Sequence, residues 1–172
     1  MCRKAPSGFS LIAAIFLLVV LALMGTLIVS ITGMQSASGQ LDLSGVRAYQ
    51  AARAGTEWAA YRVLDPENAL NPASCSPVVM PTCPAASTNL PALGGTLSSF
   101  TVTVTCAQAA DTTESNRNVR VFQIVATACN QPSSGSCPNN TSPTSGYVER
   151  RLEATFSKCK DSTASAPRCS CG

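Results

Sequence analysis

The feature that most constrains this chain is an apolar stretch near its start, "GFSLIAAIFLLVVLALMG", from Gly8 to Gly25. Apolar and small residues continue from Phe9 to Ile31, and no charged residue lies between Lys4 and Asp42. A helix crosses a bilayer core with about 20 apolar residues, so this segment is long enough to span a membrane. A secretory signal has a shorter apolar centre followed by a cleavage site, so we expect the stretch to be retained.

The residues around the stretch predict its orientation. Arg3 and Lys4 precede it, and short basic flanks stay in the cytoplasm, so we expect the rest of the chain to be exported. The nine cysteines agree, because so many are typical of an oxidising compartment. With Cys2 on the cytoplasmic side, an even set of disulfide candidates remains: Cys75, Cys83, Cys106, Cys129, Cys137, Cys159, Cys169 and Cys171.

A helical pattern continues beyond the apolar stretch, in "LDLSGVRAYQAARAGTEWAAYRVLD", and Pro66 is the first residue expected to stop it. We therefore predict one helix over residues 9–65, apolar over 9–31 and amphipathic over 32–65. Unbroken from Phe9 to about Leu64, it would be roughly 80 Å long. Three- and four-residue steps predict that its buried face holds Leu43, Val46, Ala52 (or Tyr49), Ala59 and Val63.

Beyond Pro66 the pattern is that of a sheet. The segment Asn71–Gly95 is rich in Pro, Ser, Ala and Gly, and we expect it to be irregular. Three strand-like runs follow, "SFTVTVTC", "NVRVFQIVATAC" and "YVERRLEATFS". The second is apolar on both faces, which indicates a central strand. Polar segments separate the runs, so we predict an α+β fold in which the long helix packs on a small antiparallel meander with disulfide-rich loops.

Several polar and aromatic residues have specific expected places. Trp58 and Tyr61 are expected to pack under the sheet. Asn139–Ser142 contains glycosylation-type triplets, but a polar turn is the favoured interpretation. A solvated sheet face, with a subunit contact as the alternative, is predicted for the row Glu149, Arg151 and Glu153.

The cysteine spacing suggests two local bridges. Cys75 and Cys83 enclose a loop as long as the one between Cys129 and Cys137, and each loop could close with its own disulfide, although many other pairings remain open. A zinc site is disfavoured, because the sequence has no histidine and no Cys-x-x-Cys pair. For the end Cys169–Cys171 we favour structural bridges to earlier cysteines over a redox or metal-binding role.

Composition argues against several functional classes. The net charge of +3 falls close to neutral once Arg3 and Lys4 are set aside, so nucleic-acid binding is not indicated. Histidine, the commonest general base, is absent from the sequence. No glycine-rich phosphate loop follows a strand. We therefore predict no catalytic residues, no cofactor and no metal.

A basic leader ending in Gly8, the aromatic Phe9 directly after it, a long apolar helix, an amphipathic extension and an antiparallel sheet together resemble the type IV pilins and pseudopilins. In that family, prepilin peptidase cuts after the glycine and methylates the new N-terminal residue. The resemblance implies that residues 1–8 are a removed leader, that Phe9 is N-methylated, and that residues 66–172 form an exported globular domain. The helix would lie first in the inner membrane, with the domain in the periplasm. It would then enter an extracellular filament, against the helices of other minor pilins and the major pilin.

The chain departs from the major pilins at one position. These usually carry glutamate at the fifth mature residue, where this sequence has Ala13. In the family, that carboxylate is thought to meet the N-terminal amine of the adjacent subunit, since a buried charge is costly without a partner. A subunit at the tip has no neighbour beyond it. Ala13 therefore favours a minor pilin of the tip or priming complex.

The segment "RAYQAARAGTEWAAY" is similar to biogenesis proteins of MSHA (mannose-sensitive haemagglutinin) pili. The function expected is that of a minor pilin that helps to prime or cap the filament at its tip and supports surface attachment. Three alternatives remain: a tip pseudopilin of a type II secretion system, a tip adhesin that binds a surface or glycan, and a plain single-pass anchored domain.

Overall fold

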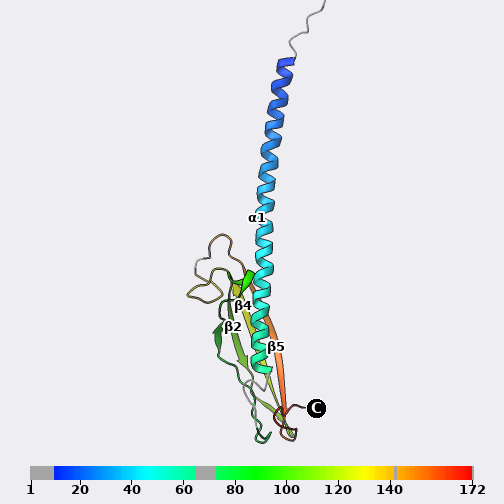
Figure 1. The fold of residues 1–172 in the computed structure, drawn as a ribbon, viewed down its shortest axis with the longest axis vertical. Coiled ribbons are helices and arrows are strands. Elements are labelled where there is room, and N and C mark those ends of the chain that lie inside the picture. Colours follow the sequence, from blue (N-terminus) through cyan, green and yellow to red (C-terminus); the bar gives the residue numbers. More distant parts are fainter. Residues whose placement is uncertain (1–9, 65–72, 142, 172) are drawn as a thin grey trace, which may run out of the picture. The chain divides into compact units, whose positions relative to one another are not determined.

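The computed structural model describes residues 10–64, 73–141 and 143–171, with the side chains of residues 10 and 32–38 excepted. The chain divides into two compact units, Met1–Asp42 and Leu43–Gly172. One helix, α1 (Ser10–Leu64), includes the described part of the first unit and opens the second (Figure 1). The expected start at Phe9 and the predicted stop at Pro66 lie outside the described residues.

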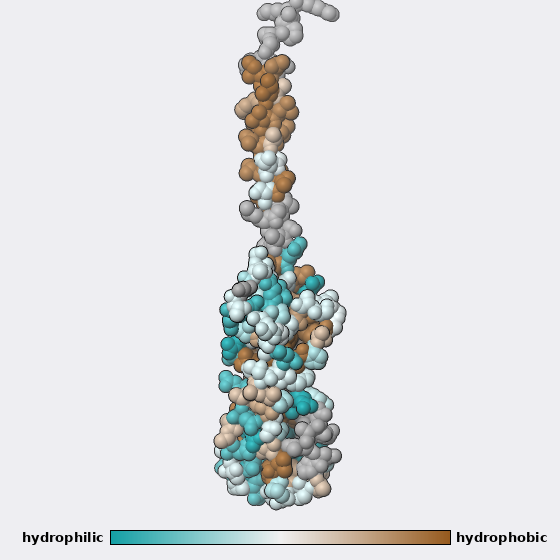
Figure 2. Space-filling model, turned by 90° about the vertical axis from the view of Figure 1, so that its left-hand side faces the viewer, coloured by the Kyte–Doolittle hydropathy of each residue, from teal (hydrophilic) through white to brown (hydrophobic). Residues whose placement is uncertain are grey.

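In the first unit, α1 presents apolar side chains to its surroundings. The segment Leu11–Ile31 is long and apolar enough to cross a membrane. Brown, hydrophobic atoms dominate this part of α1 on the face drawn in Figure 2. Leu11, Phe16 and Leu27 are each more than half exposed, at 70%, 67% and 63%. No other described residue of this unit covers these side chains, so they are available to a bilayer or to other helices.

The second unit contains an antiparallel sheet. Its described strands are β1 (Ser87–Asn89), β2 (Thr101–Gln108), β3 (Thr112–Glu114), β4 (Arg117–Cys129) and β5 (Glu149–Asp161), with a short 3₁₀ helix, η1, at Gly95–Leu97. β5 pairs with β4 along its whole length, and β2 and β3 follow one another along the opposite edge of β4. β1 pairs with the outer edge of β2. The run that is apolar on both faces is therefore the central strand, as predicted.

The predicted meander needs correction at two places. β3 forms within a segment expected to be a turn, because Ala109 donates its N–H to the carbonyl of Val121 and keeps the chain beside β4. β1 forms within the segment expected to be irregular, Asn71–Gly95, and η1 begins at the last residue of that segment. There the N–H of Leu90 donates to the carbonyl of Val102, at 2.9 Å, and holds β1 against β2.

The second part of α1 packs on one face of the sheet through small residues. Of the predicted face, Ala52, Ala59 and Val63 are fully buried. The buried helix face is completed by Gly45, Ala48, Ala51 and Gly55. Opposite it, the sheet contributes Val102, Val104, Phe122, Ile124, Ala126 and Ala128 to the same core.

The larger residues of the predicted helix face point elsewhere. Leu43 and Val46 are 53% and 58% exposed, so their predicted burial is wrong, and of the alternatives Ala52 and Tyr49 it is Ala52 that is buried, since Tyr49 is 45% exposed. Tyr61 is also exposed, at 54%, whereas Trp58 is partly buried against the core as predicted. The physical reason is size, because a helix approaches a sheet closely only where its side chains are small.

Gly55 marks the closest approach of α1 to the sheet. A Cβ atom at this position would lie 2.7 Å from Val102 Cγ1, 3.1 Å from Ala126 Cβ and 3.2 Å from Val104 Cγ2. Cβ atoms in proteins essentially never approach a neighbouring atom to less than 3.0 Å, so a side chain at position 55 would clash with Val102. The absence of a side chain therefore lets the helix rest directly on β2 and β4.

Candidate functional site

The first candidate surface is the apolar part of α1. The sequence places no charged residue between Ser10 and Leu41, so this surface offers a neighbour only apolar and small polar groups. Ala13 lies on α1 and is half-exposed, directly after the exposed Leu11 and Ile12. The predicted processing positions, Gly8 and Phe9, lie outside the described residues. Such a surface is suited to apolar contact with lipid or with other helices.

All eight candidate cysteines form disulfides: Cys75–Cys169, Cys83–Cys106, Cys129–Cys137 and Cys159–Cys171. The suggested local bridge between Cys129 and Cys137 is therefore present. The suggested bridge between Cys75 and Cys83 is wrong. The segment that carries Cys83 runs beside β2, where the N–H of Cys106 donates to the carbonyl of Ala86 at 3.2 Å. Strand pairing thus brings Cys83 to Cys106.

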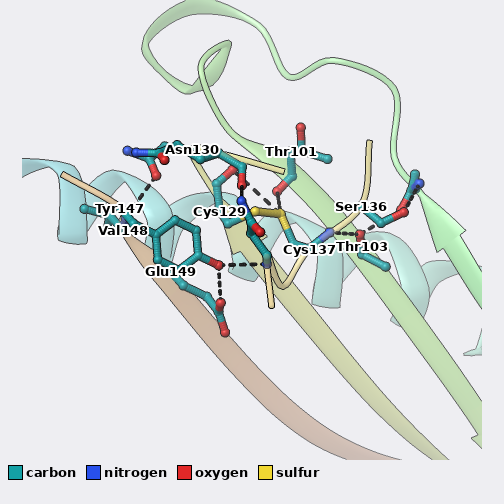
Figure 3. Close-up of a disulfide and its surroundings, with 12 residues drawn as sticks. Thr101, Thr103, Cys129, Asn130, Ser136, Cys137, Tyr147, Val148 and Glu149 are labelled. Carbon is teal, nitrogen blue, oxygen red and sulfur yellow. Dashed lines mark hydrogen bonds between the residues drawn. A yellow bond between two sulfur atoms is a disulfide. The ribbon is translucent and has the colours of Figure 1, made fainter. Parts of the chain in front are cut away.

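The Cys129–Cys137 loop forms the second candidate surface, and it is anchored on the sheet by hydrogen bonds (Figure 3). The N–H of Cys137 donates to Thr103 Oγ1 at 2.8 Å, and the Thr103 hydroxyl donates to Asn89 Oδ1 at 2.7 Å. Asn89 Nδ2 in turn donates to Ser136 Oγ at 2.9 Å. These bonds connect the loop with β1 and β2, so a loop that is polar in sequence has a fixed shape.

The start of β5 is joined to the same loop region (Figure 3). The hydroxyl of Tyr147 donates to Glu149 Oε2 and accepts a hydrogen bond from the N–H of Asn139 at 3.0 Å. The side-chain amide of Asn130 makes two hydrogen bonds to the segment before β5. Its Oδ1 accepts from the N–H of Val148, and its Nδ2 donates to the carbonyl of Gly146. Burial, with the bond to Glu149 second, raises the pKa of Tyr147 above its usual value of 10.0.

The predicted solvated row is only partly solvated. Arg151 and Glu153 are exposed and form an ion pair at 2.6 Å. Glu149 is half-buried and accepts from Tyr147 instead, so the prediction is wrong for this residue. The hydrogen bond between the Asn139 N–H and the Tyr147 hydroxyl could not be predicted from sequence. It depends on how the loop folds, and no local sequence pattern indicates that fold.

The predicted polar turn at Asn139–Ser142 is seen as far as Thr141, and Ser142 lies outside the described residues. Asn139 Oδ1 accepts hydrogen bonds from the N–H and the hydroxyl of Thr141, at 3.1 and 3.0 Å. Its Nδ2 donates to the carbonyl of Gln131 at 2.9 Å. The side-chain amide of Asn139 therefore closes the turn.

The disulfides Cys75–Cys169 and Cys159–Cys171 lie near the C-terminal end of β5. Cys169 is bonded to Cys75 and Cys171 to Cys159, so both cysteines of the C-terminal end pair with earlier ones, as favoured from sequence. Across residues 10–64, 73–141 and 143–171, no three His, Cys, Asp or Glu side chains are grouped as metal ligands.

No protein-family model, curated protein or solved structure matches this chain. The assignment of a function therefore depends on its own residues and geometry.

Proposed function

We propose that this chain is a minor pilin of an MSHA-like type IV pilus that helps to prime or cap assembly at the tip and so supports surface attachment. One observation carries the proposal. A single helix, α1, presents an exposed apolar segment over Leu11–Ile31 and then packs on an antiparallel sheet through a small-residue face. A pilin needs both elements, one to anchor and assemble and one to carry a folded exported domain.

The exposed apolar segment supplies the proposed mechanism of assembly. Before assembly it is covered by the inner membrane. In the filament it is covered by the helices of neighbouring minor pilins and of the major pilin. Apolar surface is then exchanged for apolar surface, so little hydrophobic free energy is lost when the helix leaves the lipid.

Ala13 supports a position at the tip. An ionised carboxylate at this position would be buried among apolar helices and would need a cationic partner. The alanine is half-exposed and uncharged, so it makes no such demand. A subunit without a neighbour beyond it then carries no unpaired charge.

The segment "RAYQAARAGTEWAAY", residues 47–61, favours one subfamily within the class. It resembles the MSHA pilus biogenesis protein MshP, as does the opening "GFSLIAAIFLLVVLALMG". The same segment carries the buried face of α1, with Ala48, Ala51, Ala52, Gly55 and Ala59. The residues that carry the resemblance are thus those that set how closely the helix packs on its sheet.

The proposal is tested by the mature N-terminus, measured by mass spectrometry of the protein from its host with and without prepilin peptidase. We expect a chain that begins at N-methylated Phe9 only when the peptidase is present. A Gly8→Ala variant, which alters the cleavage position alone, should remain unprocessed. A retained Met1 in the presence of the peptidase would overturn the pilin assignment and leave a plain anchored domain.

Deletion of the gene distinguishes the remaining alternatives. A priming or capping subunit predicts loss of pili from the cell surface, seen by electron microscopy. An adhesin predicts normal pili and failed attachment, and a secretion pseudopilin predicts normal pili and retained exoproteins.

The double variant Cys129→Ser with Cys137→Ser, which removes only the loop bridge, should restore piliation in the deletion strain if the loop binds no assembly partner.

A further inference from the structure

The end of β5 contains a buried amine that the proposed function does not use. Lys160 is only 1% exposed, and its Nζ has no hydrogen-bond partner in the part of the chain that the structure describes. A buried ammonium without a partner is costly, so such an amine favours its neutral form. Burial, with the charge of Lys158 second, lowers the pKa of Lys160 below its usual value of 10.5.

Lys160 has strand neighbours on both sides. On β4 it is paired with Asn118. On its other side it forms an isolated antiparallel bridge with Ser170, within the tail segment, which we define as residues 169–171. The N–H of Asp161 donates to the carbonyl of Cys169 at 2.8 Å and fixes this pairing. The tail segment therefore turns an edge position of β5 into an interior one.

Two disulfides hold the tail segment in place. Cys159 and Cys171 flank the bridge between Lys160 and Ser170, and their Cα atoms are 5.7 Å apart. Cys169 is bonded to Cys75, and both are buried, at 2% and 5% exposure. The tail has one short bridge of its own to the sheet, so covalent bonds supply most of its attachment.

We propose that the tail segment is a redox-controlled cover over Lys160. Oxidation closes Cys159–Cys171 and Cys75–Cys169, seats the tail beside β5 and removes the amine from water. Reduction by a dithiol or phosphine cleaves each S–S bond, adds two electrons and two protons to give two thiols, and oxidises the reductant. The tail then leaves β5 and Lys160 is hydrated. The inference does not depend on the pilin assignment, because it uses only contacts within the second unit.

The chain provides an unusually direct test, because Lys158 and Lys160 are the only lysines after Lys4. The full-length oxidised protein in detergent micelles is partly reduced with a phosphine, its thiols are alkylated, and its amines are acetylated for a short time. The remaining disulfides are then fully reduced and alkylated with a second, distinguishable reagent, and an arginine-specific protease releases residues 152–168. This one peptide reports the redox state of Cys159, the acetylation of Lys160 and that of Lys158, a half-buried amine that donates to the carbonyl of Leu64 at 2.9 Å and serves as the internal reference.

In molecules whose Cys159 is still disulfide-bonded, we expect Lys160 to be acetylated more than about tenfold more slowly than Lys158, since labelling must wait for a local opening. In molecules whose Cys159 is alkylated by the first reagent, the two rates should become similar. Equal rates in the oxidised molecules would overturn the burial of Lys160. Persistent protection after reduction would overturn the role of the tail.

A variant pair repeats the test without a reductant. Cys159→Ser with Cys171→Ser removes the bridge beside Lys160 while Cys169 stays bonded to Cys75, and it should raise the acetylation rate of Lys160. The matched control, Cys129→Ser with Cys137→Ser, removes a bridge from the loop region and should leave Lys160 protected. Equal protection of Lys160 from acetylation in the two double variants would contradict the proposal. As a control, Trp58 fluorescence reports whether each variant retains its helix–sheet core.

Discussion

Gly55 and Gly45 form a natural comparison for testing how α1 packs on the sheet. Both are buried glycines in the interior of the same helix. Alanine in place of either gains about 1 kcal/mol of helix propensity. At Gly55 the new Cβ meets Val102 Cγ1 at 2.7 Å, in the sheet, whereas at Gly45 it meets the guanidinium of Arg150, with Nη2 at 2.9 Å and Cζ at 3.6 Å. Arg150 is exposed, and its guanidinium makes one exposed hydrogen bond, from Nη1 to the carbonyl of Glu149 at 2.9 Å, so the flexible side chain can move aside at little cost.

The magnitude follows from these contacts. Overpacking a well-packed core costs about 1–3 kcal/mol. Because the propensity gain is common to both variants, Gly55→Ala should be less stable than Gly45→Ala by about 1–3 kcal/mol. Relative to the unsubstituted protein, Gly45→Ala should gain up to about 1 kcal/mol, and Gly55→Ala should lose up to about 2 kcal/mol.

Urea unfolding of the full chain in detergent micelles, with the disulfides intact, measures this difference. Trp58 is the one tryptophan of the sequence and packs against the core, so its fluorescence follows separation of the helix from the sheet. With a slope of about 2 kcal/mol per molar urea, the midpoints of the two variants should differ by about 1 M. Equal midpoints, or a higher midpoint for Gly55→Ala, would refute the close approach of α1 to β2 and β4.

Three further substitutions test charged and polar contacts. Because the folded pKa of Lys160 lies below 10.5, the unfolded chain binds more protons between the folded pKa and 10.5, and stability should rise with pH over that interval. Lys160→Met should abolish this rise and increase stability on the neutral side of it, as measured by urea unfolding from about pH 7 to about pH 10.5. Tyr147→Phe should cost about 1 kcal/mol, measured by thermal unfolding, because the Asn139 N–H loses its acceptor. Asp111→Asn should lower the urea midpoint by a loss of about 1–3 kcal/mol, since it leaves the partly buried Arg120 without its carboxylate.

Much of the fold could be predicted because the long helix and the longer strands have strong hydrophobic periodicity in the sequence. The apolar stretch and the helical repeat predicted α1, and the run that is apolar on both faces predicted β4 as the central strand. β1 and β3 were missed, because they are three-residue polar segments that become strands only through pairing with longer neighbours. Pairing is a tertiary property, so such short segments carry no period of their own.

The face of α1 that meets the sheet was misjudged for a different reason. The buried face was predicted from hydrophobicity, which favours Leu43, Val46 and Tyr49. Close packing of the helix on the sheet instead requires small side chains, and these three residues are exposed. A glycine at position 55 cannot contribute apolar surface, yet it decides where the sheet lies. A stripe of small residues at helical spacing was therefore the better signal for the buried face.

The disulfides show why spacing predicts a local bridge better than a distant one. Cys129 and Cys137 are 8 residues apart and close a loop at the end of β4, so proximity along the chain was sufficient. Cys75 and Cys169 are 94 residues apart and meet only because the sheet places their segments together. In the chain-entropy model the longer loop stabilises the fold by about 2 kcal/mol more, because it restricts the unfolded chain more strongly. The bridge that sequence spacing could not find is therefore the one expected to restrict the unfolded chain most.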